Sequence, residues 1–192
     1  MTTTRLFLVR HGPTHAKAMV GWTDLPADLS DTAQVARLDA ALPSEALVIS
    51  SDLSRAVATA DAIQNTRPRL PHDRDLREIH FGDWEMQNWR DIEDQERLHA
   101  YWETPGDVSP PGGESWNAVS SRVNRAVDRL LRAHAGRDVI LVAHFGVILT
   151  QVQRAKGLTG YETFAHKIDN LSLTEIHAQP TGWHLAQLNV LP

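Results

Sequence analysis

The chain has 192 residues, 42% hydrophobic and 22% charged, with a formal net charge of −5. This is an ordinary globular composition, and its acidic balance gives no support for nucleic-acid binding, which needs a basic face. The lack of cysteine excludes disulfides, thiolate chemistry and cysteine-based zinc sites. No apolar run is long enough to span a membrane, and residues 1–5 lack the apolar stretch of a signal peptide. We therefore expect one cytoplasmic domain over 1–192 that does not bind membranes.

The first predicted element is a strand at residues 6–9 that ends on Arg10 and His11. Four apolar residues in a row fit a strand buried on both faces, because a half-exposed strand would alternate. Ligands of open α/β sheets bind outside the carboxyl ends of the strands, so Arg10 and His11 should face a site. Gly12 would let the backbone turn sharply there. A strand that simply exits among surface charges is the alternative.

Residues 15–31 show no sustained hydrophobic periodicity, so we expect them to form a loop over the site. Ser30 or Asp31 can cap a helix that runs to Leu42 and is ended by Pro43.

A second buried strand is predicted at 46–49, and residues 50–52 should cap a helix over 53–63. Arg55 lies in the first turn of that helix, where a cation gains nothing from the helix dipole. An anion bound at this N-terminus would explain it, because free backbone N–H groups and Arg55 could hold the anion together. The alternative is a solvated helix residue.

The segment 76–85 is dense in acidic and aromatic residues, and we expect the aromatic ones to anchor a loop. Glu78, within it, is not explained by packing. Residues 85–102 predict an exposed amphipathic helix, which could cover the pocket or form a homodimer contact. The Pro- and Gly-rich stretch 106–113 predicts a further loop.

A long helix should begin at Ser115 and be closed by Gly136. A third buried strand at 139–143 ends on His144, as the first ends on His11, and a helix follows over 147–155. The final strands, 171–176 and 183–190, should form an antiparallel hairpin at the end of the sheet.

Three strand ends thus offer Arg10 with His11, Arg55 and His144, and in a parallel sheet they converge on one edge. Two guanidiniums and two imidazoles in one crevice describe a site for a dianion, and phosphate is the obvious candidate. Nearby positive charge keeps an imidazole neutral, and a neutral imidazole can attack phosphorus. Glu78 is a reasonable general acid for the leaving alkoxide.

Five ordered blocks lie within residues 5–150: Arg10-His11-Gly12 with Thr14, Ser51 to Ala56 with Thr59-Ala60, Leu76 to Glu78 with Phe81 to Glu85, Pro111 to Ser115, and Val142 to Gly146. Together they resemble the histidine phosphatase superfamily, in its phosphoglycerate mutase-like branch. The resemblance implies a three-layer α/β/α sandwich with a mostly parallel mixed sheet, and an enzyme that needs no metal or organic cofactor.

Position by position, the resemblance implies that His11 is the phosphorylated nucleophile and Glu78 the proton donor. Arg10, Arg55 and His144 would hold the phosphoryl group, with Thr14 and Lys17 also on the substrate. Lys17 stands where relatives commonly have Asn, so it could contact the phosphate or point into solvent.

Residues 77–85 look most like α-ribazole phosphatase and related small phosphatases, and the short chain favours hydrolysis over mutase-type phosphoryl transfer. We therefore expect a phosphomonoesterase for a small phosphorylated metabolite, with α-ribazole phosphate as one candidate. The alternatives are a phosphoglycerate mutase activity, a catalytically weak phosphate-binding module and a metal-dependent hydrolase. No His-Glu-x-x-His helix supports the last of these. The other histidines should be superficial or structural, and the role of His80 is open.

Overall fold

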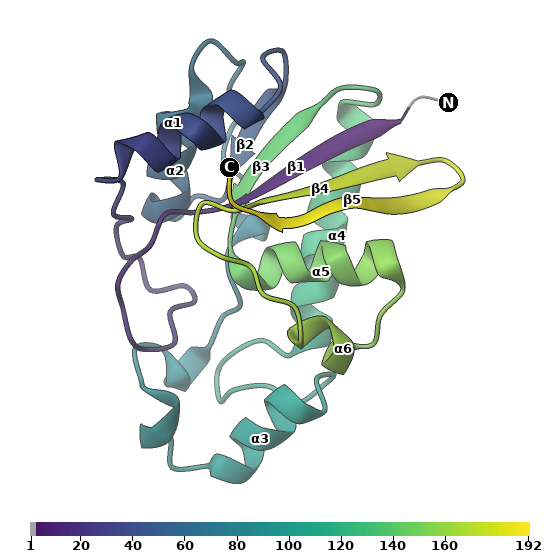
Figure 1. Ribbon diagram of the computed structural model, residues 1–192. Coiled ribbons are helices and arrows are strands. Elements are labelled where there is room, and N and C mark those ends of the chain that lie inside the picture. The colour runs from purple at the N-terminus through teal and green to yellow at the C-terminus, as the bar shows by residue number, and fades with distance from the viewer. Residues whose placement is uncertain (1–2) are drawn as a thin grey trace.

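The structure is a computed structural model that describes residues 3–192; Met1 and Thr2, part of the stretch analysed for a signal peptide, lie outside the described residues. A five-stranded mixed sheet runs through the molecule in the order β2-β3-β1-β4-β5 (Figure 1). Its first three strands in space are parallel, whereas β4 pairs antiparallel with β1 and β5 with β4. The strands are β1 (Thr4–Arg10), β2 (Leu47–Ser50), β3 (Val139–Ala143), β4 (Leu173–Gln179) and β5 (Gly182–Val190).

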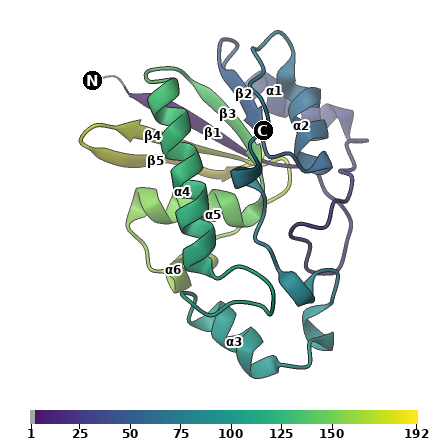
Figure 2. The ribbon, with the colours of Figure 1, turned by 180° about the vertical axis from the view of Figure 1, so that it is seen from behind.

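Helices cover both faces of this sheet. One face carries α1 (Thr32–Ala41) and α2 (Ser54–Gln64), and the other carries α4 (Trp116–Ala133) and α5 (Phe145–Lys156) (Figures 1 and 2). Phe7 and Val9 belong to the core on the α1 and α2 side, and Leu6 and Leu8 to the core on the α4 and α5 side. A continuous apolar run is what such a doubly covered strand requires. The predicted three-layer α/β/α fold and the final hairpin are confirmed.

The strand register places the carboxyl ends of β1, β2 and β3 side by side. Arg10 lies opposite Ala143, and His11 N–H donates to the Ala143 carbonyl at 3.0 Å. Ser51 N–H donates to the Val142 carbonyl at 3.2 Å. The residues that follow these three strands therefore meet at one edge of the sheet.

The predicted helix over residues 85–102 is wrong in its first half. Short 3-10 turns occupy Arg74–Leu76, Gly82–Trp84 and Trp89–Asp91, and helix α3 begins only at Gln95 and ends at Glu103. Met86 has a φ of 61°, which an α-helix does not tolerate. A short helix, α6 (Gly160–Phe164), packs against α3, where Trp102 contacts Phe164. Within residues 3–192 no helix is both long and apolar enough to cross a membrane.

The prediction that residues 50–52 cap α2 is also wrong. The helix begins at Ser54, and Leu53 at the N-cap position makes no side-chain capping bond. Asp24, from the loop after β1, accepts hydrogen bonds from the Ser54 N–H and hydroxyl at 2.8 and 2.7 Å. A residue 30 positions earlier in the chain thus caps the helix, which ties the 15–31 loop to the edge of the sheet.

Candidate active site

Three of the predicted site residues lie in contact at this edge of the sheet. His11 follows β1, His144 joins β3 to α5, and Arg55 lies in the first turn of α2. The rings of His11 and His144 have their centroids 5.0 Å apart, and Arg55 Nε donates to His11 Nε2 at 3.3 Å. The residues are 6%, 0% and 1% exposed in the order His11, His144 and Arg55. Two imidazoles and a guanidinium therefore share one buried space.

The hydrogen bonds of His11 define its tautomer. His11 Nδ1 lies 2.6 Å from the Gly12 carbonyl, which can only accept, so Nδ1 carries the proton and Nε2 keeps its lone pair. Burial, together with the charge of Arg55, lowers the pKa of His11 from 6.5 to about 3. Asn170 holds the backbone in place by donating its amide to the His11 carbonyl at 2.8 Å. His11 is thus a neutral, fixed imidazole near pH 7.

These shifts predict a loss of stability in acid. Burial also lowers the pKa of His144 well below 6.5, with His11 and Arg55 adding to the effect. Between pH 6.5 and about 3, the unfolded chain binds a proton at His11 and the folded chain does not, and His144 adds to the difference as pH falls below 6.5. The free energy of unfolding should therefore fall as pH falls, by up to about 1.4 kcal/mol per pH unit for each fully shifted histidine.

Urea unfolding between pH 7 and pH 4 tests this expectation. His11→Gln should lose less stability than the wild type across that window, whereas His99→Gln, at an exposed position of α3, should lose as much. Equal losses in the wild type and His11→Gln would contradict the assignment of a buried neutral His11.

Two buried nitrogens of the site have no hydrogen-bond partner among residues 3–192: Arg10 Nε and His144 Nδ1. The other ends of both side chains are anchored, since an Arg10 Nη donates to the Ile168 carbonyl at 2.6 Å and His144 Nε2 bonds the Ser51 hydroxyl at 2.7 Å. Buried polar groups are nearly always paired, so these two nitrogens fit an anionic ligand. Ser51, expected to help cap α2, orients His144.

Glu78 is a buried carboxyl, 6% exposed, next to the N-terminus of α5. Its Oε1 accepts hydrogen bonds from Ile79 N–H at 3.0 Å and Gly146 N–H at 2.9 Å. Burial raises the pKa of Glu78 and outweighs these bonds and the charges of Arg55 and Arg10, which favour ionisation. A carboxyl whose pKa is raised beside two arginines is suited to hold and transfer a proton.

The contact between Glu78 and Gly146 predicts a sensitive glycine. A Cβ at Gly146 would lie 2.5 Å from Glu78 Oε1 and 2.7 Å from the Ile79 side chain. Gly146→Ala should therefore displace Glu78, lowering activity and reducing stability by roughly 1–3 kcal/mol, as overpacking typically does. Gly106→Ala is the matched control, because its Cβ would meet nothing closer than 3.8 Å. Thermal unfolding and turnover measure both effects; unchanged turnover in Gly146→Ala would contradict this contact.

Glu85 organises the loop over the site, and sequence reasoning gave it no role. Its carboxylate accepts from the N–H groups of Gly21 at 3.0 Å and Trp22 at 2.7 Å, and from the Thr23 hydroxyl at 2.8 Å. Although burial acts in the opposite direction, these hydrogen bonds lower the pKa of Glu85. The carbonyls of Gly21 and Thr23 then accept from Arg55 at 2.6 and 3.0 Å. Glu85 thus fixes the backbone of residues 21–23, whose carbonyls bind Arg55.

The remaining predicted residues are more exposed than His11, Arg55 and His144. Lys17 is exposed and Thr14 half-buried, and within residues 3–192 neither side chain makes a hydrogen bond to the cluster. The ring of His80 packs edge-on against Trp22, with centroids 4.4 Å apart. No group of three or more His, Asp or Glu side chains in the described part of the chain is arranged to hold a metal ion.

The chain is similar to several known proteins in sequence and in fold. The family model described as Histidine phosphatase superfamily (branch 1) matches residues 6–191. The adenosylcobalamin/alpha-ribazole phosphatase of Escherichia coli is 32% identical over 174 residues, covering 86% of this chain and 85% of that protein. The solved structure of Bacillus stearothermophilus YhfR superposes with a TM-score of 0.86 at 28% identity, covering 95% of each chain. A mycobacterial glucosyl-3-phosphoglycerate phosphatase superposes with a TM-score of 0.82 at 26% identity, covering 98% of this chain and 99% of its own.

Proposed function

Because the chain belongs to the histidine phosphatase superfamily, we propose that it is a metal-independent phosphomonoesterase that acts through a phosphohistidine on His11. The observation that carries the proposal is the state of His11, a buried neutral imidazole with its Nε2 lone pair facing Arg55. Such a nitrogen is a nucleophile at neutral pH, and a cation beside it can bind the group under attack.

In the first step, His11 Nε2 attacks phosphorus. An N–P bond forms, the ester P–O bond breaks, and the leaving oxygen takes a proton from Glu78. Charge on the equatorial oxygens is stabilised by Arg55 and His144, which contact His11, and by Arg10, whose charge also acts on His11. Both hydrogen bonds to Glu78 fall on Oε1, so we assign the transferable proton to Oε2.

In the second step, the Glu78 carboxylate accepts a proton from a water that attacks phosphorus. The N–P bond breaks, orthophosphate leaves, and His11 returns to its neutral form. Glu78 returns to the protonated form that its raised pKa favours. Atoms and protons therefore balance over the cycle: one ester and one water give one alcohol and one phosphate.

The substrate we propose is a small phosphorylated metabolite, and α-ribazole phosphate is one candidate, supported by the name of the Escherichia coli relative. A second relative is named for glucosyl-3-phosphoglycerate, so proteins of this fold are named for different substrates.

The test is orthophosphate release from a panel of phosphomonoesters in excess chelator, with α-ribazole phosphate, phosphoglycerates and sugar phosphates included. We expect chelator-insensitive hydrolysis, with the best ester defining the substrate class. Loss of activity in chelator would favour a metal-dependent hydrolase. Exchange between phosphoglycerates without orthophosphate release would favour a mutase, and binding of esters without turnover a phosphate-binding module.

A further inference from the structure

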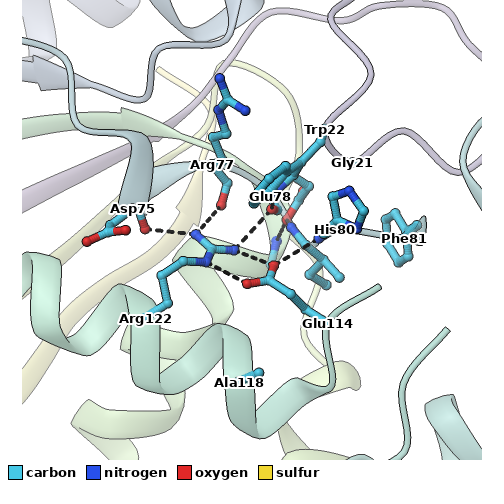
Figure 3. A network of polar contacts seen from close by, with 12 residues as sticks. Gly21, Trp22, Asp75, Arg77, Glu78, His80, Phe81, Glu114, Ala118 and Arg122 are labelled. Atoms are coloured by element: carbon cyan, nitrogen blue, oxygen red, sulfur yellow. Dashed lines mark hydrogen bonds and ion pairs between the residues drawn. The ribbon is translucent and has the colours of Figure 1, made fainter. Parts of the chain in front are cut away.

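Arg122, on α4, lies at the centre of a polar network beneath Glu78 (Figure 3). It donates to the carbonyls of Asp75 at 2.8 Å, Arg77 at 3.0 Å and Glu78 at 3.2 Å. The carboxylate of Glu114 accepts from Arg122 through both oxygens, each at 2.7 Å. One buried guanidinium therefore holds the backbone that leads into Glu78, and one carboxylate fixes that guanidinium.

Trp22, in the loop that follows β1, contacts the same Glu78 carbonyl. Its indole N–H donates to the Glu78 carbonyl at 2.9 Å, so that oxygen accepts from both Trp22 and Arg122. The Trp22 ring is held by three guanidiniums, with those of Arg74, Arg77 and Arg122 at 5.2, 5.1 and 6.0 Å from its centroid. Cation–π contacts of this kind fix the orientation of an indole.

Trp22 also lies between the two residues that bind Arg55. The carbonyls of Gly21 and Thr23, on either side of it, accept from the two Nη atoms of Arg55. Its backbone neighbours thus position a phosphate-binding group while its side chain positions the backbone of Glu78. A single loop residue links the two halves of the site.

The backbone around Glu78 needs such support, because residues 77–81 belong to no helix or strand. A general acid must come within hydrogen-bond reach of the leaving oxygen, and a misplacement of about 1 Å can cost 10²-fold in rate. We propose that Trp22 and Arg122 are positioning residues that hold Glu78 in proton-transfer geometry. This inference rests on the proposed function, in which Glu78 is the proton donor.

Trp22→Phe tests the inference, because it keeps an aromatic ring and removes the indole N–H. We would measure kcat/KM for glycerol 2-phosphate, whose alkoxide needs a proton to leave, and for p-nitrophenyl phosphate, whose phenolate needs little help. We expect a loss of roughly 10-fold on the alkyl ester and under about 3-fold on the aryl ester, as for one weakened hydrogen bond. Trp116→Phe is the control, since it removes a buried indole hydrogen bond to Gln153 (2.8 Å) instead.

Arg122→Lys is the second variant, because it keeps the charge beside Glu114 and loses the fork that spans three carbonyls. Its control is Arg129→Lys, whose arginine pairs with Asp73 and Asp75 at the surface. We expect the same selective loss on the alkyl ester in Arg122→Lys and no selectivity change in Arg129→Lys.

Glu78→Gln removes the proposed proton donor itself. Its losses of kcat/KM on the alkyl and aryl esters are therefore the reference for the other two variants. If Glu78→Gln is selective for the alkyl ester but Trp22→Phe and Arg122→Lys slow both esters equally or not at all, the positioning inference is wrong and the proposed function stands. If Glu78→Gln itself slows both esters equally, the proton-donor assignment fails, and the inference with it.

Discussion

Replacement of His11 by alanine is expected to lower kcat by a factor on the order of 10⁴ or more, because it removes the proposed nucleophile from the site. The groups proposed to bind the anion, Arg10, Arg55 and His144, come from separate elements and should remain in place. His11→Ala should therefore still bind orthophosphate while failing to release it from an ester. Steady-state kinetics and isothermal titration with orthophosphate measure the two properties separately.

His99→Ala is the matched control, because His99 is an exposed histidine on α3. It should keep the activity of the wild type. Hydrolysis that persists in His11→Ala at a substantial fraction of the wild-type rate would exclude a phosphohistidine on this residue. Loss of both orthophosphate binding and activity would show that the substitution disturbs the anion site as a whole.

Glu78→Gln is expected to lower kcat/KM on alkyl esters by roughly 10²–10⁴, the usual contribution of a general acid. The amide keeps the size of the side chain and an oxygen that can accept from Ile79 and Gly146. It carries no proton that can be transferred to an alkoxide. The loss should shrink as the leaving group becomes a better one, which a series of alkyl and aryl phosphates would measure.

The pH dependence gives an independent check on the same residue. In the proposed mechanism Glu78 acts in its protonated form, and its raised pKa extends that form above the usual range of a glutamic acid. The wild-type kcat/KM should therefore fall as pH rises through this raised pKa, and Glu78→Gln should lose that limb of the profile. Glu96→Gln, at an exposed position of α3, is the control. A profile of unchanged shape in Glu78→Gln would contradict the assignment.

The core of the fold and the contact between His11, Arg55 and His144 could be predicted from the sequence. Buried parallel strands are marked by continuous apolar runs, and the residue that follows such a run lies at the edge where ligands bind. Three such runs and one arginine in the first turn of a helix were enough to bring these side chains together.

The supporting contacts could not be predicted, because in each of them at least one partner lies in a segment without a periodic pattern. Glu85 bonds backbone groups some 60 residues earlier, and Asp24 caps a helix 30 residues later. Arg122 looks like any arginine on a long helix until the carbonyls of another segment surround it. The charged, aromatic stretch that begins at Glu85 has the composition of an exposed helix, yet Glu85 turns inward and α3 starts only at Gln95.

The most direct test of a phosphohistidine on His11 is rapid quenching in alkali during turnover of a radiolabelled phosphate ester, followed by mapping of the labelled peptide at alkaline pH. We expect a transient phosphoenzyme labelled on His11 that is stable in alkali and labile in acid, as a phosphoramidate is. No such species should form in His11→Ala. Turnover with no labelled protein at any quench time, or label on a residue other than His11, would contradict the proposed mechanism.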